Sequence, residues 1–314
     1  MSQLVMVTGG LGFVGKASAL GALKNGWRVR VSSRQKFTAS MSSIEHFNVG
    51  DLSSTTYWPS ALQGVESVVH CAGRAHVFKE TVDGQLDAFR GVNLEGTLHL
   101  ARACVKAHVK RFVFISSIGV NGSETKINKQ FSEIDDPNPH NAYALSKWEA
   151  EKGLLQIAAE TGLEVVIIRP PLVYGCNAPG NFGSLMRAVQ GGWPLPLAAV
   201  HNQRSLVALD NLVDFIVTCI THPQAANQTF LVSDGQDLST TELVRGMAQA
   251  AGVPARLLPV PVWALQAGAS LLGKGDAVKR LCGNLQVDIS KARNLLGWVP
   301  PVSVEEGLRR AMAV

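Results

Sequence analysis

The stretch LVMVTGGLGFVG, residues 4–15, joins a short apolar run to a glycine-rich loop. The run LVMV (4–7) carries no charge, and Gly9, Gly12 and Gly15 follow it just before a helical pattern. Glycines permit a tight turn and a close approach of the backbone to a pyrophosphate, and a helix N-terminus supplies N–H donors. The order strand, glycine loop, helix therefore predicts a dinucleotide-binding site.

Apolar runs of the same kind recur through the first half of the chain. Runs that are β-branched and do not alternate in polarity suit strands buried on both faces of a parallel sheet. Helical patterns lie between them, and two of these end at Gly26 and Gly162. The alternation predicts an α/β fold, a Rossmann-type doubly wound parallel sheet. Further strands are expected at RVRVS (28–32), SVVHCA (67–72), RFVFISS (111–117) and EVVIIRP (164–170).

The amino-acid composition changes after Pro170, where proline and glycine become frequent. Farther on, QTFLVS (228–233) has the pattern of another strand, which predicts that the chain returns to the sheet. We therefore expect a cofactor-binding Rossmann domain and a smaller C-terminal substrate lobe. The cofactor domain is expected to comprise residues 1–170 and about 206–234, and the lobe residues 171–205 and 235–314.

Charge and composition narrow the classes of function. The net charge is +5, from 29 basic and 24 acidic side chains, but no run of five basic residues forms a nucleic-acid arm. This balance suits an anionic small ligand. No stretch approaches 18 apolar residues, so no membrane span is predicted. The five cysteines are scattered without metal-ligand spacing, and no secretory leader precedes them, which predicts reduced thiols in a cytoplasmic protein with no metal site.

Tyr143 and Lys147 are candidates for proton chemistry. They are four residues apart on a predicted helix and therefore share a face. Free tyrosine has a pKa near ~10, which a neighbouring cation lowers and burial raises. Ser116 and Ser117 end the predicted strand RFVFISS, at the sheet edge where ligands of α/β folds bind. The pattern predicts that Tyr143 exchanges a proton, Lys147 tunes it and a serine orients a carbonyl.

Several motifs together resemble one family. They are TGGLGFVG (8–15), GDL (50–52), HCAG (70–73), VN (92–93), FISSIGVNG (114–122), YALSK (143–147) and RPPLVYG (169–175). The chain resembles the extended short-chain dehydrogenase/reductase family of nucleotide-sugar epimerases, dehydratases and ketoreductases. The resemblance implies Ser-Tyr-Lys chemistry with Ser117 as the catalytic serine. Asn121 stands where the family pattern usually has tyrosine.

The resemblance also implies which residues contact the cofactor. Asp51 would accept from the adenine amino group, with a turn residue as the alternative. Asn93 would hold a relay water, or else cap its helix. The implied set is Gly9, Gly12, Phe13, Val14, Gly15, Ser33, Arg34, Asp51, Leu52, Cys71, Ala72, Gly73, Asn93, Tyr143, Lys147 and Pro170.

The second strand bears on the choice of cofactor. RVRVSSRQ (28–35) lacks the acidic residue that would accept from a ribose 2′-hydroxyl, and Ser33 and Arg34 could donate to a 2′-phosphate. This favours NADP(H), with NAD(H) as the alternative. An exposed Arg34 that points into solvent is the competing interpretation.

The substrate is expected to be a UDP-sugar held by the lobe. PGNFGSLM (179–186), with Asn181, and NQRSLVALDNLVD (202–214), with Arg204, resemble stretches of nucleotide-sugar enzymes. An arginine fork and helix-terminal N–H groups are good diphosphate ligands. Arg280 is a second candidate, and Ser117 would contact the sugar. Surface positions are the alternative for both arginines.

The later segments resemble bacterial O-antigen enzymes that act on UDP-N-acetylhexosamine derivatives. A 4-epimerase regenerates its cofactor, whereas a reductase consumes NADPH, so the second strand favours the reductase. The sequence thus predicts an NADPH-dependent reductase of a UDP-2-acetamido-2,6-dideoxy-hexos-4-ulose. The alternatives are a UDP-hexose or UDP-N-acetylhexosamine 4-epimerase with bound NAD and, more remotely, a non-catalytic NADP(H)-binding protein. The resemblance also implies a homodimer through helices carrying Leu98, Trp148, Leu155 and Ala159, which could equally be core.

Overall fold

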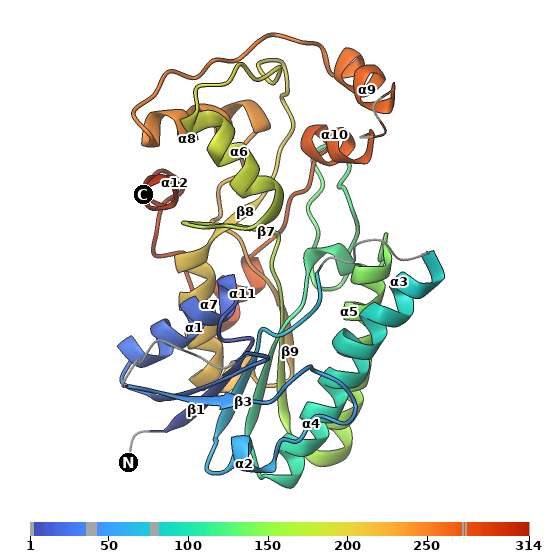
Figure 1. Cartoon of the computed structure of the whole chain (residues 1–314), viewed down its shortest axis with the longest axis vertical. Helices are drawn as coiled ribbons and strands as arrows, with labels where there is room; N and C mark the ends of the chain where they lie inside the picture. The colour runs from blue at the N-terminus through green and yellow to red at the C-terminus, as the bar shows by residue number, and fades with distance from the viewer. Residues whose placement is uncertain (1–2, 36–42, 76–81, 272, 274, 314) are drawn as a thin grey trace.

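The computed structural model describes residues 3–35, 43–75, 82–271, 273 and 275–313. A seven-stranded sheet with strand order β3-β2-β1-β4-β5-β6-β9 forms the lower part of the molecule (Figure 1). All neighbouring strands run parallel. The strands are β1 (Leu4–Thr8), β2 (Arg28–Ser33), β3 (Ile44–Asn48), β4 (Ser67–His70), β5 (Arg111–Ile115), β6 (Glu164–Arg169) and β9 (Gln228–Leu231).

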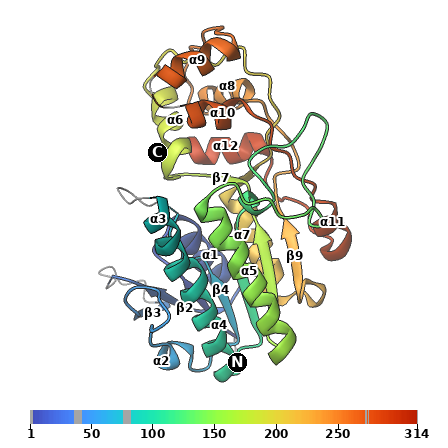
Figure 2. The same cartoon turned by 90° about the vertical axis from the view of Figure 1, so that its right-hand side faces the viewer.

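Helices cover both faces of the sheet (Figures 1 and 2). Every residue of β1 and β5 is buried, as expected for strands between two helical layers. The doubly wound α/β fold is therefore confirmed. One face is covered by α1 (Phe13–Lys24), α7 (Leu209–Thr221) and α11 (Ser290–Leu296), and the other by α2 (Pro59–Leu62), α4 (Thr97–Lys106) and α5 (Ala142–Thr161).

The strand order places a ligand-binding crevice beside β1. The chain moves outward from β1 through β2 to β3 and then crosses back to β4 on the other side of β1. At such a switch point the loops after the two central strands diverge, and the crevice lies outside their carboxyl ends. The loops after β1 and β4 begin at Gly9 and Cys71.

A second lobe lies above the carboxyl edge of the sheet (Figure 1). It has its own apolar core and a two-stranded parallel sheet of β7 (Leu172–Tyr174) and β8 (Leu206–Ala208), a pairing that the sequence did not indicate. Its helices are α6 (Gly180–Gln190), α8 (Thr240–Ala250), α9 (Val262–Leu271), α10 (Gly275–Cys282) and α12 (Val304–Met312).

Asn93 does not cap a helix, and that interpretation is wrong. It lies within Arg90–Gly96, a π-helical segment that joins α3 (Val82–Phe89) directly to α4. The backbone stays helical on both sides of this segment, so no free helix N-terminus exists there for a side chain to cap. The wider turn of a π-helix often marks a functional position.

The helices of the predicted dimer contact are only partly engaged within the chain. A Cβ on Gly153 of α5 would lie 2.6 Å from Leu98 of α4, so these two helices pack closely. Leu155 and Ala159 of α5 are exposed. The homodimer stays a prediction.

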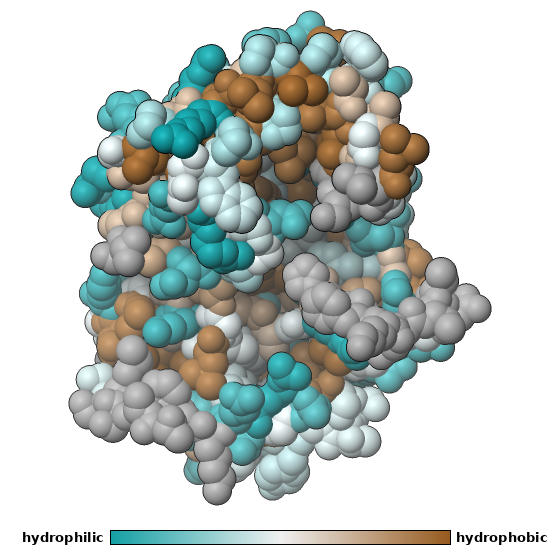
Figure 3. Space-filling view, turned by 45° about the horizontal axis from the view of Figure 1, so that its top comes forward, coloured by the Kyte–Doolittle hydropathy of each residue, from teal (hydrophilic) through white to brown (hydrophobic). Residues whose placement is uncertain are grey.

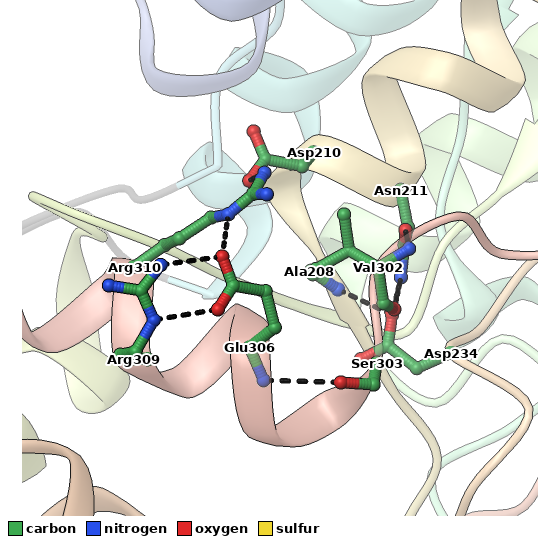
Figure 4. A network of polar contacts seen from close by, with 9 residues as sticks. All are labelled: Ala208, Asp210, Asn211, Asp234, Val302, Ser303, Glu306, Arg309 and Arg310. Atoms are coloured by element: carbon green, nitrogen blue, oxygen red, sulfur yellow. Dashed lines mark hydrogen bonds and ion pairs between the residues drawn. The ribbon is translucent and has the colours of Figure 1, made fainter.

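Buried hydrogen bonds fasten the lobe to the sheet domain (Figure 4). Asn211 of α7 donates to Asp234 Oδ1 at 2.7 Å and to the carbonyl oxygen of Val302 at 2.8 Å. It also accepts from the Val302 amide at 2.9 Å. The same oxygen of Asp234 accepts from the Ala208 amide at 2.8 Å. Beside this centre, Glu306 of α12 forms surface ion pairs with its neighbouring arginines.

We expect Asn211→Ala to lower the free energy of unfolding by about 2–4 kcal/mol, because it leaves both Val302 backbone groups without their partner inside the protein. Chemical denaturation measures this change. The exposed Gln156, which bonds only its neighbour Glu160 among the described contacts, provides the control, and Gln156→Ala should cost less than about 0.5 kcal/mol. Equal losses in the two variants would contradict the assignment.

Candidate functional site

The glycine loop is shaped for a backbone contact with a ligand. Gly9 has φ +65°, a left-handed conformation that favours glycine, and a Cβ there would lie 2.9 Å from the backbone of Ala72. A Cβ on Gly15 would overlap the carbonyl oxygen of Gly9. Helix α1 starts after Gly12 without a side-chain cap, so its first N–H groups remain available to an anion.

A cavity of about 850 Å³ lies along this loop. It runs from the end of β2 across the crevice to the segment that follows β4. This shape and the glycines at positions 9, 10 and 12 of the loop fit a dinucleotide. Nine of the predicted cofactor residues line it, namely Gly9, Gly12, Ser33, Arg34, Asp51, Leu52, Cys71, Ala72 and Gly73.

The end of β2 offers one free donor rather than two. The Ser33 hydroxyl lies 2.6 Å from the carbonyl oxygen of Gln35, to which it donates, and 2.8 Å from His46 Nε2. The guanidinium of Arg34 lies 3.6 Å from Asp51, and both side chains are mostly exposed at 78% and 84%. Asp51 is also the one carboxylate among the described residues that line the cavity. Arg34 is therefore the group best able to meet a 2′-phosphate.

Asn93 fixes the loop after β4 against the catalytic helix. Its Oδ1 accepts from the Arg74 amide at 2.8 Å, and its Nδ2 donates to the Arg74 carbonyl and to Ser146, each at 3.0 Å. The side chain is fully buried. Asn93 thus holds the cavity wall at Gly73, and its role with a relay water stays a prediction.

Tyr143 and Lys147 lie on the first turns of α5. The side chain of Asn141 caps this helix by accepting from the Ala144 amide at 2.8 Å. Lys147 Nζ donates to the carbonyl oxygen of Ile115 at 2.9 Å and lies 4.4 Å from the centre of the Phe114 ring. It is also 3.4 Å from the position of a Cβ on Gly73, at the end of the cofactor cavity.

Burial dominates the proton affinities of this pair. It raises the pKa of Tyr143 to about 12. It lowers the pKa of Lys147 to about 8, although attraction to Cys71 and Glu151 opposes this change. The lowering of the Tyr143 pKa expected from Lys147 is not found, because burial is the cause of the shift. At neutral pH the structure holds Tyr143 as the phenol and Lys147 mainly as the cation.

The two serines have different partners. Ser116 is buried and donates its hydroxyl to Glu151 Oε1. Ser117 accepts from the Gly119 amide at 3.1 Å through its oxygen, which leaves its own proton for a ligand. A Cβ on Gly119 would lie 3.3 Å from both Ser117 Oγ and Ala144 of α5, so this serine faces the first turn of the catalytic helix. Of the pair, Ser117 has the free donor.

Sequence reasoning missed a buried ion pair behind these residues. Arg169, at the end of β6, contacts Glu151 of α5 at 2.6 Å, with side chains only 5% and 1% exposed. Arg169 also donates to Asn121 Oδ1 at 2.9 Å. Glu151 follows Lys147 by one helical turn, and that spacing on one face was the available signal. Asn121, where the family pattern has tyrosine, is thus a partner of the buried arginine.

The predicted substrate arginines lie together. Arg204 donates to the carbonyl oxygen of Arg280 at 2.6 Å and to that of Gly283 at 3.0 Å. Its guanidinium therefore bonds the free carbonyl groups at the C-terminal end of α10. Arg280 is exposed, and its charge helps burial to lower the pKa of His140. A Cβ on Gly119 would lie 3.5 Å from His140 and 3.3 Å from Ser117 Oγ, so the imidazole that feels the charge of Arg280 lies beside Ser117.

Four other predicted residues lie elsewhere in the site region. Asn181 is exposed in the first turn of α6, and none of the described hydrogen bonds links it to Arg204 or Arg280. Pro170 follows β6, and its carbonyl oxygen accepts from the Ile118 amide at 3.0 Å. Pro170 therefore lies beside Ser117. Phe13 and Val14 open helix α1 directly after the glycine loop.

We expect Glu151→Gln to lower the pKa of Lys147, because the carboxylate favours the ammonium form. We expect the ammonium to donate to a cofactor ribose, so cofactor binding should weaken as pH rises through the pKa near about 8, and at lower pH in the variant. Titration of NAD by fluorescence over a pH series measures this midpoint.

The matched control is Glu149→Gln, on the same helix. Glu149 pairs with Arg90 at 2.5 Å and is not a cause of the Lys147 shift. Its midpoint should stay at the wild-type pH. If the two variants gave the same midpoint, Glu151 would not be setting the charge of Lys147.

Comparison with known proteins identifies the family to which the sequence is similar. The sequence model of the NAD dependent epimerase/dehydratase family matches residues 5–233. A relative in Vibrio cholerae named UDP-glucose 4-epimerase is 46% identical over 312 residues, covering 99% of this chain and 94% of the relative. An Escherichia coli O157:H7 relative, N-acetyl-alpha-D-glucosaminyl-diphospho-ditrans,octacis-undecaprenol 4-epimerase, is 28% identical over 99% of this chain and 95% of its own.

Solved structures share the fold at lower identity. The Thermotoga maritima UDP-glucose 4-epimerase with UDP-glucose has a TM-score of 0.77 at 22% identity, covering 99% of this chain and 97% of the other. The Bacillus cereus UDP-glucuronic acid 4-epimerase in complex with NAD has a TM-score of 0.78 at 21% identity, covering 99% and 96%. Both have the architecture described above over their whole length.

Proposed function

Because the chain belongs to the NAD dependent epimerase/dehydratase family, we propose that it is a 4-epimerase of UDP-linked sugars that works with bound NAD. The observation that carries the proposal is the Vibrio cholerae UDP-glucose 4-epimerase, whose 46% identity extends over 99% of the chain. This reverses the ranking from sequence alone, in which the reductase came first. The retained Ser117, Tyr143 and Lys147 weigh against a non-catalytic protein.

In this proposal three side chains share the work at sugar C4. Bound NAD would supply the hydride-accepting and hydride-donating chemistry at C4. Tyr143 takes the C4 hydroxyl proton and gives it back, while the Ser117 hydroxyl donates to the C4 oxygen. Burial favours the phenol form of Tyr143. The Lys147 cation, one helical turn away, opposes that effect when Tyr143 acts as the base.

The diphosphate of the substrate would be held by the lobe. Arg280 is exposed near His140 and Ser117, and Arg204 fixes the end of the same helix. A guanidinium is well suited to a diphosphate. The Vibrio cholerae and Escherichia coli relatives differ in the group beyond the diphosphate, a nucleoside in the first name and a polyprenol in the second. We propose the UDP-sugar as substrate, and the assay includes both.

The reductase remains a second candidate because of the end of β2. The exposed Arg34 faces the cofactor cavity, and β2 itself ends without a carboxylate. An enzyme that draws on NADPH in each turnover would use such a group on the 2′-phosphate.

We expect the purified protein to interconvert UDP-glucose with UDP-galactose, or UDP-N-acetylglucosamine with UDP-N-acetylgalactosamine, without added cofactor. Tyr143→Phe should lower kcat about 10²–10⁴-fold because it removes the proton carrier. Tyr57→Phe, on the exposed surface, should leave kcat unchanged. NMR of the products measures the conversion, and a parallel arm tests N-acetylglucosamine linked to a polyprenyl diphosphate.

A different result would select the reductase. If no pair of epimers interconverts and the protein consumes NADPH with a UDP-4-keto-6-deoxy-N-acetylhexosamine, the epimerase proposal is wrong. Conversion of the polyprenyl substrate alone would retain the 4-epimerase chemistry and correct the substrate.

The double change Ser33→Asp with Arg34→Asn tests the cofactor preference directly. It supplies a carboxylate for a ribose hydroxyl and removes the cation for a 2′-phosphate. NADPH affinity should fall by at least about tenfold, and NAD affinity should be kept or increased. Calorimetric titration of both cofactors measures this. If NADPH affinity survived the double change, Arg34 would have no role in cofactor choice.

A further inference from the structure

Most of the excess positive charge of the chain lies in the lobe. Residues 171–205 and 235–314 hold 11 lysines and arginines but 6 aspartates and glutamates, whereas the rest of the chain holds 18 of each. Lys291, Arg293 and Asp288 in this count lie on or beside α11, which packs on the sheet, so the lobe itself carries most but not all of the net charge of +5. One diphosphate neutralises only part of this excess, and the remaining positive charge suits a larger anionic surface.

The basic lobe also contains a long uncharged stretch. LLPVPVWALQAGASLLG, residues 257–273, has no charged side chain and lies between Arg256 and Lys274 in the sequence. It includes α9. No helix in the described part of the chain is both long and apolar enough to cross a membrane. Contact with a bilayer would have to take place along its surface.

Helix α9 is apolar on two sides, although the protein covers only one of them. Val262 and Leu265 pack on the core of the lobe, and Ala269 is buried. Trp263 is 72% exposed and Leu271 is 89% exposed, and with the exposed Ala267 they follow a spacing of four residues. This spacing places the three on one outward stripe. The exposed Gln266 and Ser270 border this stripe, so the outward side of α9 combines large apolar with uncharged polar side chains.

Two other segments of the lobe also expose large apolar side chains. Leu258, which is 49% exposed, is held by backbone hydrogen bonds with Leu195 at 2.8 Å. Trp193, two residues before Leu195, is 67% exposed. We call Trp193, Leu258, Trp263 and Leu271 the apical patch. Figure 3 shows apolar side chains gathered at the top of the lobe, above a hollow.

The apical patch belongs to the part of the lobe that closes over the site. Helix α9 packs against α10 (Figures 1 and 2). The last turn of α10 holds Arg280, whose carbonyl oxygen accepts from Arg204. The charge of Arg280 helps to lower the pKa of His140, which lies beside Ser117. A surface that docks on the apical patch thus lies on the same helix pair as the substrate arginines.

We propose that the apical patch is a docking surface for an anionic lipid membrane, on which α9 lies flat with Trp263 and Leu271 in the interface. Exposed tryptophan and leucine on a surface helix are features of interfacial helices, and Arg256 and Lys274 border the uncharged stretch in the sequence. The positive lobe complements anionic headgroups, which attract lysine and arginine near the bilayer. A second copy of the same lobe would instead bring like charges together. This inference goes beyond the proposed activity and does not require it.

Flotation with vesicles tests the proposal on the full chain. Wild-type protein should float with vesicles of about three parts phosphatidylcholine to one part phosphatidylglycerol, and much less with phosphatidylcholine alone. High salt should weaken the binding, since it screens the attraction of headgroups for the lobe. Trp263→Ser with Leu271→Ser should lower the bound fraction at least about tenfold, because both apolar anchors are removed.

The matched control is Tyr57→Ser with Ile134→Ser. These residues are 71% and 93% exposed, close to Trp263 and Leu271, but lie outside the lobe. The control should float like the wild type. Both double variants should keep wild-type turnover of a UDP-sugar without vesicles, which shows that they are folded and keeps this test separate from that of the activity.

Three results would overturn the proposal. One is wild-type protein that stays unbound with the anionic vesicles. Another is equal loss of binding in the two double variants, since the apical patch would then have no special role. The third is a change from dimer to monomer on gel filtration in the Trp263→Ser, Leu271→Ser variant without vesicle binding by the wild type, which would assign the patch to a second copy.

Discussion

The ion pair between Glu151 and Arg169 joins the elements on which the site depends. It is almost fully buried, and it links the catalytic helix α5 to the end of β6. Removing one partner of such a pair typically costs about 3–5 kcal/mol, since the other charge is left buried and unpaired. Each member of the pair also forms a hydrogen bond with a further side chain. Ser116 donates to Glu151, and Asn121 accepts from Arg169, so the strand end that carries Ser117 is held in the same network.

The same carboxylate has an electrostatic role at Lys147. Burial drives the pKa of Lys147 down to about 8, and Glu151 is one of two groups that oppose this. A lysine buried without such a partner would lose its proton more readily, because low-dielectric surroundings penalise the ammonium. The network therefore couples the position of Ser117 to the charge of Lys147. A single buried acid supports both the geometry and the electrostatics of the proposed chemistry.

Much of this arrangement could be predicted from the sequence, and the limits have physical causes. Strands buried on both faces leave a strong local signal, so the sheet and the glycine loop were found. The β7–β8 pair was missed because strands of three residues carry almost no pattern. Glu151 and Arg169 were missed because their pairing depends on contacts 18 residues apart. The helix cap, one of two alternatives for Asn93, was wrong because a π-helical segment has no signature in a single sequence.

The question of epimerase or reductase shows how local and global signals can disagree. The end of β2 is a local signal, since it concerns a few atoms around the ribose, and there Ser33 is already bonded while Arg34 lies near Asp51. This ion pair is exposed, and such pairs contribute little, so Arg34 can leave Asp51 for a phosphate at small cost. It can equally remain there while NAD binds. The β2 end therefore permits NADP(H) without requiring it. Sequence similarity to a named 4-epimerase along the whole chain is thus the stronger argument in choosing between epimerase and reductase.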